Sequence, residues 1–167
     1  MDIVGRLAAS EEIRRLKARY CRYIDTKQWE LLAGLFADDA RFQGLGSVAS
    51  GAGVAAFVAA VSERLADCVS IHHCHMPDLV FLDDVTARGV WAMEDLVHWS
   101  RPVPSREAPG APGFRGYGHY EEEYRRVGET WKISYLRLTR LRIDPMAADH
   151  PYPSDGLLAA SPDWLKS

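Results

Sequence analysis

The sequence TARGVWAMEDLVHW, residues 86–99, has the two-residue alternation and the aromatic and β-branched content of a long β-strand. Because successive side chains of a strand point to opposite faces, Glu94 and His98 share one face. The other face carries Trp91, Met93, Asp95, Val97 and Trp99. An ionised, unpaired acid among such apolar side chains is costly, so Asp95 is predicted to have a partner or a function. The simplest partner is a neighbouring arginine or a backbone N–H.

Further strands are predicted on both sides of this stretch. Asp83-Asp84 is typical of a turn, and Val127-Gly128-Glu129 is typical of a hairpin connection. Residues 102–113 are rich in proline and glycine, show no periodicity and predict a loop. The predicted strands are residues 40–42, 69–75, 79–82, 116–126 and 130–143.

Three helices are predicted before the main run of strands. Residues 10–24 carry apolar side chains at helical spacing, and Ser10 followed by Glu11 and Glu12 is typical of a helix start. The other two helices are predicted at residues 27–36, closed by Asp38-Asp39, and at residues 54–65.

Helices followed by antiparallel strands indicate an α+β fold. We expect one domain, residues 1–144, in which about three helices pack on a strongly curved mixed or antiparallel sheet that encloses a pocket. The prolines beyond residue 144 predict a C-terminal tail, residues 145–167, that packs on the body or on a neighbouring subunit.

Composition excludes several classes of protein. The 167 residues have a net charge of −3, whereas proteins that grip nucleic-acid phosphates usually carry a basic surplus. We expect no membrane partner, because no apolar run is long enough to span a bilayer, and a cytoplasmic location, because the N-terminus lacks a signal-peptide pattern. The three cysteines have no CxxC spacing, so neither a disulfide framework nor a zinc site is expected.

The histidine cluster at residues 72–75 is the first candidate for chemistry. Alternation places His72 and Cys74 on one face of a strand, and His73 and His75 on the other. No accompanying ligand pattern favours a metal site. The alternative is that these histidines belong to the core or the surface.

Tyr20 and Asp25 form the second candidate, at the end of the first predicted helix. Tyr20 lies on the apolar stripe, so its hydroxyl needs a buried partner or a pocket. Asp25 follows five residues later and joins Tyr20 only if the helix ends near Ile24 and the chain turns inward. The alternative is that Asp25 caps the second helix.

The stretch RYCRYID at residues 19–25, with Trp29 and Leu35-Phe36, resembles the opening of SnoaL-like proteins of the nuclear-transport-factor-2-like (NTF2-like) superfamily. Among these it is most similar to the bile-acid 7α-dehydratases, and the resemblance covers roughly residues 8–143. The lindane dehydrochlorinases are similar through an Asp–His dyad, and the scytalone dehydratases share the fold. The resemblance implies a catalytic set of Tyr20, Asp25, His72, Asp95 and Arg140.

The resemblance implies a role for each of these side chains. His72 acts as general base, and Asp25 fixes its tautomer and stabilises the imidazolium. Tyr20 donates a hydrogen bond to the developing enolate oxygen or to the departing group. Asp95 holds or protonates the leaving hydroxyl, and Arg140 binds a negative group or pairs with an acid.

The predicted pocket favours a small, apolar, flat or polycyclic substrate. Its expected lining is Trp91, Met93, Trp99, Phe42 and Tyr120. No metal, nucleotide or flavin motif is present, so we expect no cofactor and no metal. Residues 102–113 and the tail depart from the family pattern, which leaves the substrate open.

Several functions are consistent with these features. The leading one is a cofactor-independent dehydratase that abstracts a proton and eliminates water from a hydroxylated carbonyl, steroid-like or polyketide compound. An isomerase or cyclase would use the same dyad. A non-catalytic ligand-binding or dimerisation module, and the small subunit of a ring-hydroxylating oxygenase, share the fold.

We also expect a homodimer or homotrimer. The outer face of the predicted sheet carries apolar residues such as Val90 and Leu96. The sequence leaves the roles of His73, His75 and His98 open, and a subunit interface is one place for them.

Overall fold

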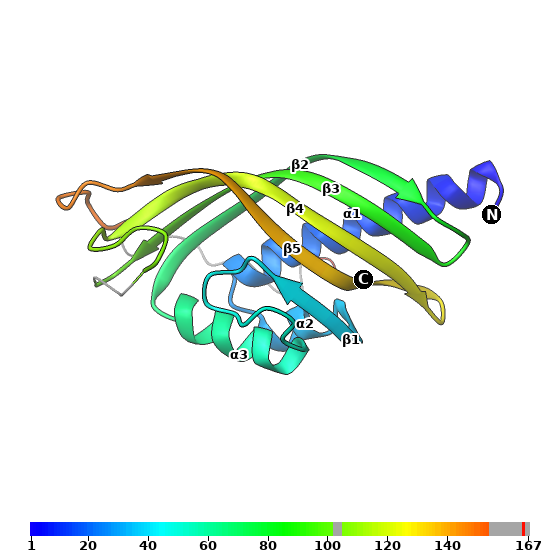
Figure 1. Ribbon diagram of the computed structural model, residues 1–167, viewed down its shortest axis with the longest axis horizontal. Helices are drawn as coiled ribbons and strands as arrows, with labels where there is room; N and C mark the ends of the chain where they lie inside the picture. Colours follow the sequence, from blue (N-terminus) through cyan, green and yellow to red (C-terminus); the bar gives the residue numbers. More distant parts are fainter. Residues whose placement is uncertain (102–104, 154–164, 166–167) are drawn as a thin grey trace.

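The computed structural model describes residues 1–101, 105–153 and 165. Three helices pack against a five-stranded curved sheet, which confirms the predicted α+β class (Figure 1). The sheet has the order β1-β5-β4-β3-β2 and is mixed, because β1 is parallel to β5 while the other neighbours are antiparallel. The elements are α1 (Ile3–Asp25), α2 (Trp29–Ala33), β1 (Phe36–Gln43), α3 (Val54–Leu65), β2 (Cys68–Phe81), β3 (Thr86–Trp99), β4 (Gly113–Val127) and β5 (Thr130–Pro145).

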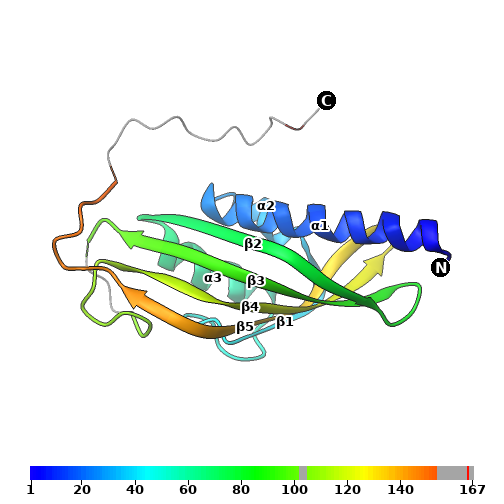
Figure 2. The same ribbon diagram turned by 90° about the horizontal axis from the view of Figure 1, so that it is seen from above.

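The core lies between the helices and the inner face of the sheet. On β3 the buried side chains alternate as predicted, and Trp91, Met93, Asp95, Val97 and Trp99 all lie inward. The α1 helix runs along β2, and Figure 2 shows both elements on the same side of the molecule. The last residue of α1, Asp25, comes to lie beside Ser70 and His72 in the first half of β2, where the candidate site forms.

The start of the first helix differs from the prediction. The α1 helix begins at Ile3, and Asp2 rather than Ser10 caps it, because the Asp2 carboxylate accepts a 2.7 Å hydrogen bond from the Gly5 N–H. Ser10 lies inside the helix and donates to the Arg6 carbonyl. The first two turns show no buried apolar stripe, because Ile3, Val4 and Leu7 are exposed.

The second helix is much shorter than predicted. It covers only Trp29–Ala33, and the residues expected to continue and close it, Phe36 to Asp39, begin β1. The strand forms because β5 lies alongside and pairs with it, with Phe36 opposite Ile133. A contact between segments that far apart in sequence overrides the local helical pattern.

The two strands predicted at residues 69–75 and 79–82 are one strand. The β2 strand continues through Pro77, with an irregularity in its register between Cys74 and Pro77. Proline is tolerated there because β2 is an edge strand of the sheet. Among the described residues no further strand pairs with its outer side, where a backbone N–H is not needed.

The outer face of the sheet and the described part of the tail meet at His98. The His98 side chain is buried, and its ring centroid lies 5.4 Å from that of His150 and 4.9 Å from that of Tyr152. The rest of the predicted loop and tail, residues 102–104, 154–164 and 166–167, lies outside the described residues. Val90 is exposed on this face, and the predicted homo-oligomer stays a prediction. Within the described ranges, no helix has the length and apolarity needed to cross a bilayer.

Candidate active site

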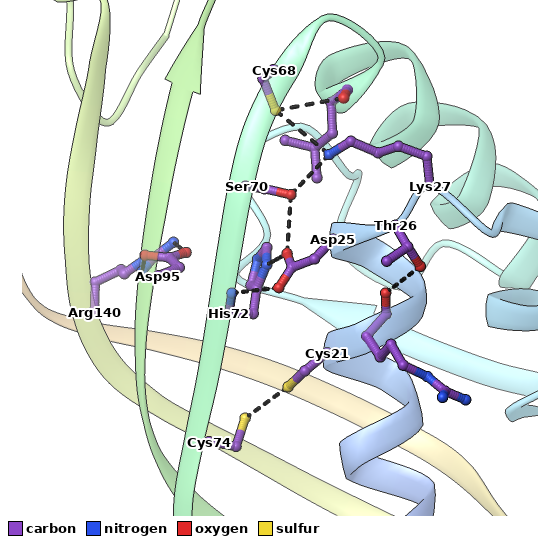
Figure 3. Close-up of polar contacts among 12 residues, drawn as sticks. Cys21, Asp25, Thr26, Lys27, Cys68, Ser70, His72, Cys74, Asp95 and Arg140 are labelled. Carbon is purple, nitrogen blue, oxygen red and sulfur yellow. Dashed lines mark hydrogen bonds and ion pairs between the residues drawn. The ribbon is translucent and has the colours of Figure 1, made fainter. Parts of the chain in front are cut away.

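Asp25, at the end of α1, meets His72, on the inner face of β2 (Figure 3). His72 Nδ1 lies 2.6 Å from Asp25 Oδ1. Because a carboxylate only accepts hydrogen bonds, Nδ1 is the donor, and Nε2 is the basic atom of the neutral ring. The His72 side chain is 7% exposed and that of Asp25 21%. The predicted contact between the two side chains is therefore present.

Two more donors hold the Asp25 carboxylate. The His72 backbone N–H donates to Oδ2 at 2.8 Å, and the Ser70 hydroxyl donates to Oδ1 at 3.0 Å. Together with the His72 ring, these donors fix the carboxylate on β2. The alternative role, in which Asp25 caps the second helix, is wrong, because Gln28 is the N-cap of α2.

The chain turns inward after Asp25 because α1 ends in a Schellman motif. The Gln28 N–H donates to the Tyr23 carbonyl at 2.8 Å, and the Lys27 N–H donates to the Ile24 carbonyl at 3.2 Å. Lys27 occupies the left-handed position of the motif with φ of 59°. Glycine is the usual residue there, and Lys27 is the only non-glycine residue with positive φ in the part of the chain that the structure describes.

The contacts of the Lys27 side chain explain why a lysine occupies this position. Its Nζ donates to Ser70 Oγ at 2.8 Å and lies 3.8 Å from Cys68 Sγ, while Ser70 donates onward to Asp25 (Figure 3). Burial lowers the pKa of Lys27, and the charges of Cys68 and Asp25 oppose that shift. Sequence reasoning missed Lys27 and Ser70. The only sequence signal for Lys27 is that a lysine stands at a helix end where glycine is usual. This signal can be recognised only after the end of α1 is known.

Asp95 and Arg140 form a second polar pair near the dyad. Asp95 lies opposite His72 in the β2–β3 register, and both Arg140 Nη atoms donate to its carboxylate at 2.7 Å. Gly116 of β4 lies opposite Asp95, and a Cβ at that position would collide with both charged groups. The geometry is the bidentate fork in which a guanidinium donates two parallel hydrogen bonds to one carboxylate. The expected arginine partner of Asp95 is thus Arg140.

Tyr20 and Tyr120 lie side by side in the same hollow. Both are buried, and their ring centroids are 5.6 Å apart in an edge-to-face arrangement. Burial raises the pKa of each hydroxyl well above its usual value, so both stay protonated and able to donate.

The cavity brings four of the five predicted catalytic side chains together, with Asp25 behind His72. Its volume is about 70 Å³, and Arg64 and Glu107, joined by a 2.8 Å ion pair, form part of its lining. The polar lining includes Tyr20, His72, Asp95, Tyr120 and Arg140, and most of the remaining lining is apolar, including Ile24, Phe57, Val61, Leu65, Val97, Phe114 and Leu138.

Of the five residues predicted to line the pocket, Tyr120 does so and the others lie behind the lining. Trp91 donates to the Tyr124 hydroxyl at 2.7 Å, and Phe42 stacks on Phe57 with centroids 4.1 Å apart. Trp99 Nε1 donates to the Arg64 carbonyl at 3.0 Å. Met93 Sδ lies 3.7 Å from Arg140 Nη1. Phe57 and Phe114 are the aromatic residues of the lining that sequence reasoning missed.

His73 and His75 point away from the cavity. Both are exposed, with His73 Nδ1 3.2 Å and His75 Nε2 3.9 Å from Glu94 Oε1. No group of three or more His, Cys, Asp or Glu side chains among the described residues has the arrangement of a metal site.

Comparisons with known proteins agree with this architecture. Residues 5–137 match the SnoaL-like domain family. A probable cyclase of Gibberella zeae is 26% identical over 143 residues, which are 80% of this chain and 91% of the cyclase.

Two solved structures show the same fold at low sequence identity. A type 2 hexachlorocyclohexane dehydrochlorinase superposes with a TM-score of 0.77 at 22% identity, covering 92% of this chain and 99% of its own. A candidate scytalone dehydratase from Novosphingobium aromaticivorans has a TM-score of 0.75 at 16% identity, covering 94% and 100%. With its match over residues 5–137 and its NTF2-like fold, this chain belongs to the SnoaL-like domain family.

Proposed function

We propose that the protein is a cofactor-independent lyase in which the Asp25–His72 dyad abstracts a proton and drives β-elimination of water. The observation that carries the proposal is the dyad itself. His72 Nδ1 is committed to Asp25, and the same imidazole lines a largely apolar cavity. A base with this tautomer, next to an apolar hollow, suits removal of a proton acidified by a neighbouring carbonyl.

The proton moves from the substrate carbon to His72 Nε2. The electron pair of the broken C–H bond moves toward the carbonyl, and the Tyr20 hydroxyl is proposed to donate to the resulting enolate oxygen. As the enolate collapses, the β-C–O bond breaks, and the imidazolium returns its proton to the departing hydroxide. The products are one unsaturated carbonyl compound and one water, and the base is restored.

The Asp95–Arg140 pair is proposed to bind the leaving hydroxyl. Both Asp95 oxygens accept hydrogen bonds from Arg140, and this arrangement supports holding the hydroxyl over protonating it. The Asp95 carboxylate can accept a hydrogen bond from that hydroxyl while Arg140 donates one.

Lys27 and Ser70 are proposed to position Asp25. Ser70 links the ammonium to the carboxylate through hydrogen bonds of 2.8 and 3.0 Å. This arrangement places a positive charge behind the carboxylate and restricts rotation of its side chain. Asp25 is thereby held against His72 Nδ1 through the catalytic cycle.

The small volume of the cavity limits the size of substrate that it can enclose as it stands. A volume of about 70 Å³ is well below the few hundred Å³ that enclose a ligand of drug size. A steroid-like or polyketide substrate therefore requires the cavity to widen, and separation of the Arg64–Glu107 ion pair in its lining is one way to widen it. Small cyclic hydroxyketones belong in the same screen.

The experiment is a screen of hydroxylated ketones, read as loss of one water by mass spectrometry. We expect His72→Ala to lower turnover by on the order of 1,000-fold, as removal of a general base does. His73→Ala is the matched control, because it removes the adjacent, exposed imidazole. Full activity of the His72 variant on a verified substrate would exclude the dyad mechanism.

An isomerase or cyclase using the same dyad is the second candidate. The match to the probable cyclase, over 80% of this chain, is the observation that favours it. Proton abstraction and Tyr20 donation stay the same, but the enolate then closes a ring or is reprotonated elsewhere. A product with unchanged mass and a new structure in the same screen would select this candidate.

A further inference from the structure

Two cysteines face each other across the contact between α1 and β2. Cys21 Sγ and Cys74 Sγ lie 3.5 Å apart, within hydrogen-bonding distance for sulfur (Figure 3). Cys21 is four residues before Asp25 on α1, and Cys74 is two residues after His72 on β2. The thiol pair therefore joins the same two elements as the dyad, one helical turn away.

The two thiols differ in acidity. The hydrogen bond with Cys74 lowers the pKa of Cys21 to about 7, with the charges of Lys17 and His72 adding to the shift against burial and Asp25. The same hydrogen bond and burial raise the pKa of Cys74. The hydrogen bond between the two sulfurs therefore favours ionisation of one thiol of the pair, and the lowered pKa of Cys21 makes it the candidate nucleophile.

Both sulfurs adjoin a second hollow, whose lining shares only His72 with that of the substrate cavity. It has a volume of about 280 Å³, and its lining includes Cys21, Cys74, Arg14 and Trp91. Neither cysteine is fully buried. By contrast, burial raises the pKa of Cys68, whose sulfur contacts the Leu65 carbonyl and Lys27. Cys68 is therefore an internal control for thiol reactivity.

We propose that Cys21 and Cys74 form an oxidation site, at which a hydroperoxide converts the pair to a disulfide that ties α1 to β2 beside the dyad. The Cys21 thiolate attacks one peroxide oxygen, the O–O bond breaks, and the leaving hydroxide or alkoxide takes a proton. The Cys74 sulfur then attacks the Cys21 sulfenic acid, the S–O bond breaks and water leaves. Two electrons pass from the sulfurs to the peroxide. An added dithiol then reduces the disulfide back to two thiols by exchange and is itself oxidised to a disulfide.

Formation of the disulfide is independent of the proposed function, and only its effect on turnover rests on that function. The disulfide would close a loop from residue 21 to residue 74 and restrict the unfolded chain. We therefore expect the oxidised protein to melt several degrees above the reduced one. With α1 fixed to β2, the dyad loses freedom to adjust to substrate, so turnover should change on oxidation and recover on reduction.

The test treats the reduced full-length protein with hydrogen peroxide, removes the peroxide, alkylates free thiols and maps peptides by mass spectrometry. The expected result is a Cys21–Cys74 linked peptide that dithiothreitol abolishes, with Cys68 alkylated. Cys68→Ser should give the same link, while Cys21→Ser and Cys74→Ser should not.

A second measurement needs no variant. In the native reduced protein, iodoacetamide should label Cys21 at least tenfold faster than Cys68 near pH 7. Oxidation that stops at sulfinic or sulfonic acid without a link overturns the proposal. So do thiols that stay reduced while free glutathione is oxidised, and equal labelling of Cys21 and Cys68.

Discussion

Among the described residues, two ionic clusters join α1 to the inner face of the sheet, and they differ in whether a polar atom is left unpaired. Lys17 pairs with Glu122, and their side chains are 1% and 0% exposed. The Tyr124 hydroxyl donates to the other Glu122 oxygen, and Lys17 Nζ lies 4.0 and 3.6 Å from the ring centroids of Tyr20 and Tyr120. Among the described residues, no buried polar side-chain atom of this closed cluster lacks a hydrogen-bond partner.

The Asp25–His72 cluster leaves one basic atom without a partner. The Asp25 oxygens accept three hydrogen bonds, but His72 Nε2 has no partner among the described residues. The comparison separates a buried pair that supports the core from one that is available for chemistry. Mutations in the first cluster should therefore change stability, and mutations in the second should change turnover.

The largest expected effect is on the closed cluster. Lys17→Met removes one partner and leaves Glu122 buried without its counter-charge. We expect the free energy of unfolding to fall by about 3–5 kcal/mol, measured by urea denaturation. Lys17→Met combined with Glu122→Met should recover most of the loss, because no unpaired charge then remains. A loss below about 1 kcal/mol for the single variant would remove the distinction between the two clusters.

The next effect concerns Tyr20, which lies between the two clusters. Tyr20→Phe keeps the ring on Lys17 but removes the hydroxyl that is proposed to face the enolate oxygen. We expect turnover to fall about 100-fold, as loss of an oxyanion donor does. Tyr124→Phe is the matched control, since it removes a buried hydroxyl from the closed cluster and should mainly lower the melting temperature. Equal turnover in both variants would contradict the role of Tyr20.

The local sequence pattern predicted correctly those helices and strands whose apolar residues recur at a regular period. The bounds of α3 and β3 agree with the prediction, because each has a continuous apolar face at its own period. The pattern failed at β1, whose partner β5 is about a hundred residues away, and at α1, whose first turns are exposed. In each failure a tertiary contact or a side-chain cap replaced the periodic signal.

The site shows the same division. Resemblance to the family proposed Asp25 and His72 together, whereas spacing alone favoured a cap role for Asp25. Lys27, Ser70 and the Cys21–Cys74 contact depend on how α1 docks on β2, which no local pattern encodes. The aromatic pocket lining was mispredicted because strand alternation gives the face of a side chain but not its depth behind the cavity wall.

A smaller effect is expected at Lys27, where backbone strain and function coincide. Lys27→Gly suits the left-handed φ of 59° and should raise the free energy of unfolding by up to about 1 kcal/mol. The same change removes the ammonium behind Asp25, so we expect turnover to fall about tenfold. Lys27→Arg keeps the charge and should retain more activity than Lys27→Gly. Unchanged turnover in Lys27→Gly would show that the lysine has no part in holding Asp25.

The smallest effect extends the comparison to His98 on the outer face. Burial lowers the pKa of His98, and His150 adds to the shift. Below the unfolded value of about 6.5, the unfolded chain therefore binds more protons than the folded one, and stability falls as pH drops through the folded pKa. His98→Phe should flatten this part of the pH dependence between about pH 7.5 and pH 5 in urea titrations. If the free energy of unfolding depends on pH in the same way in wild type and His98→Phe, the contribution of His98 is refuted.

The most direct test of the open cluster is Asp25→Asn, measured for both turnover and melting temperature in the same preparation. The substitution keeps the shape of the side chain but presents an amide to His72 Nδ1, which disfavours the base-competent tautomer. We expect turnover to fall at least about 100-fold while the melting temperature stays within a few degrees of wild type. Retained turnover, or a melting temperature that drops as far as that of Lys17→Met, would contradict it.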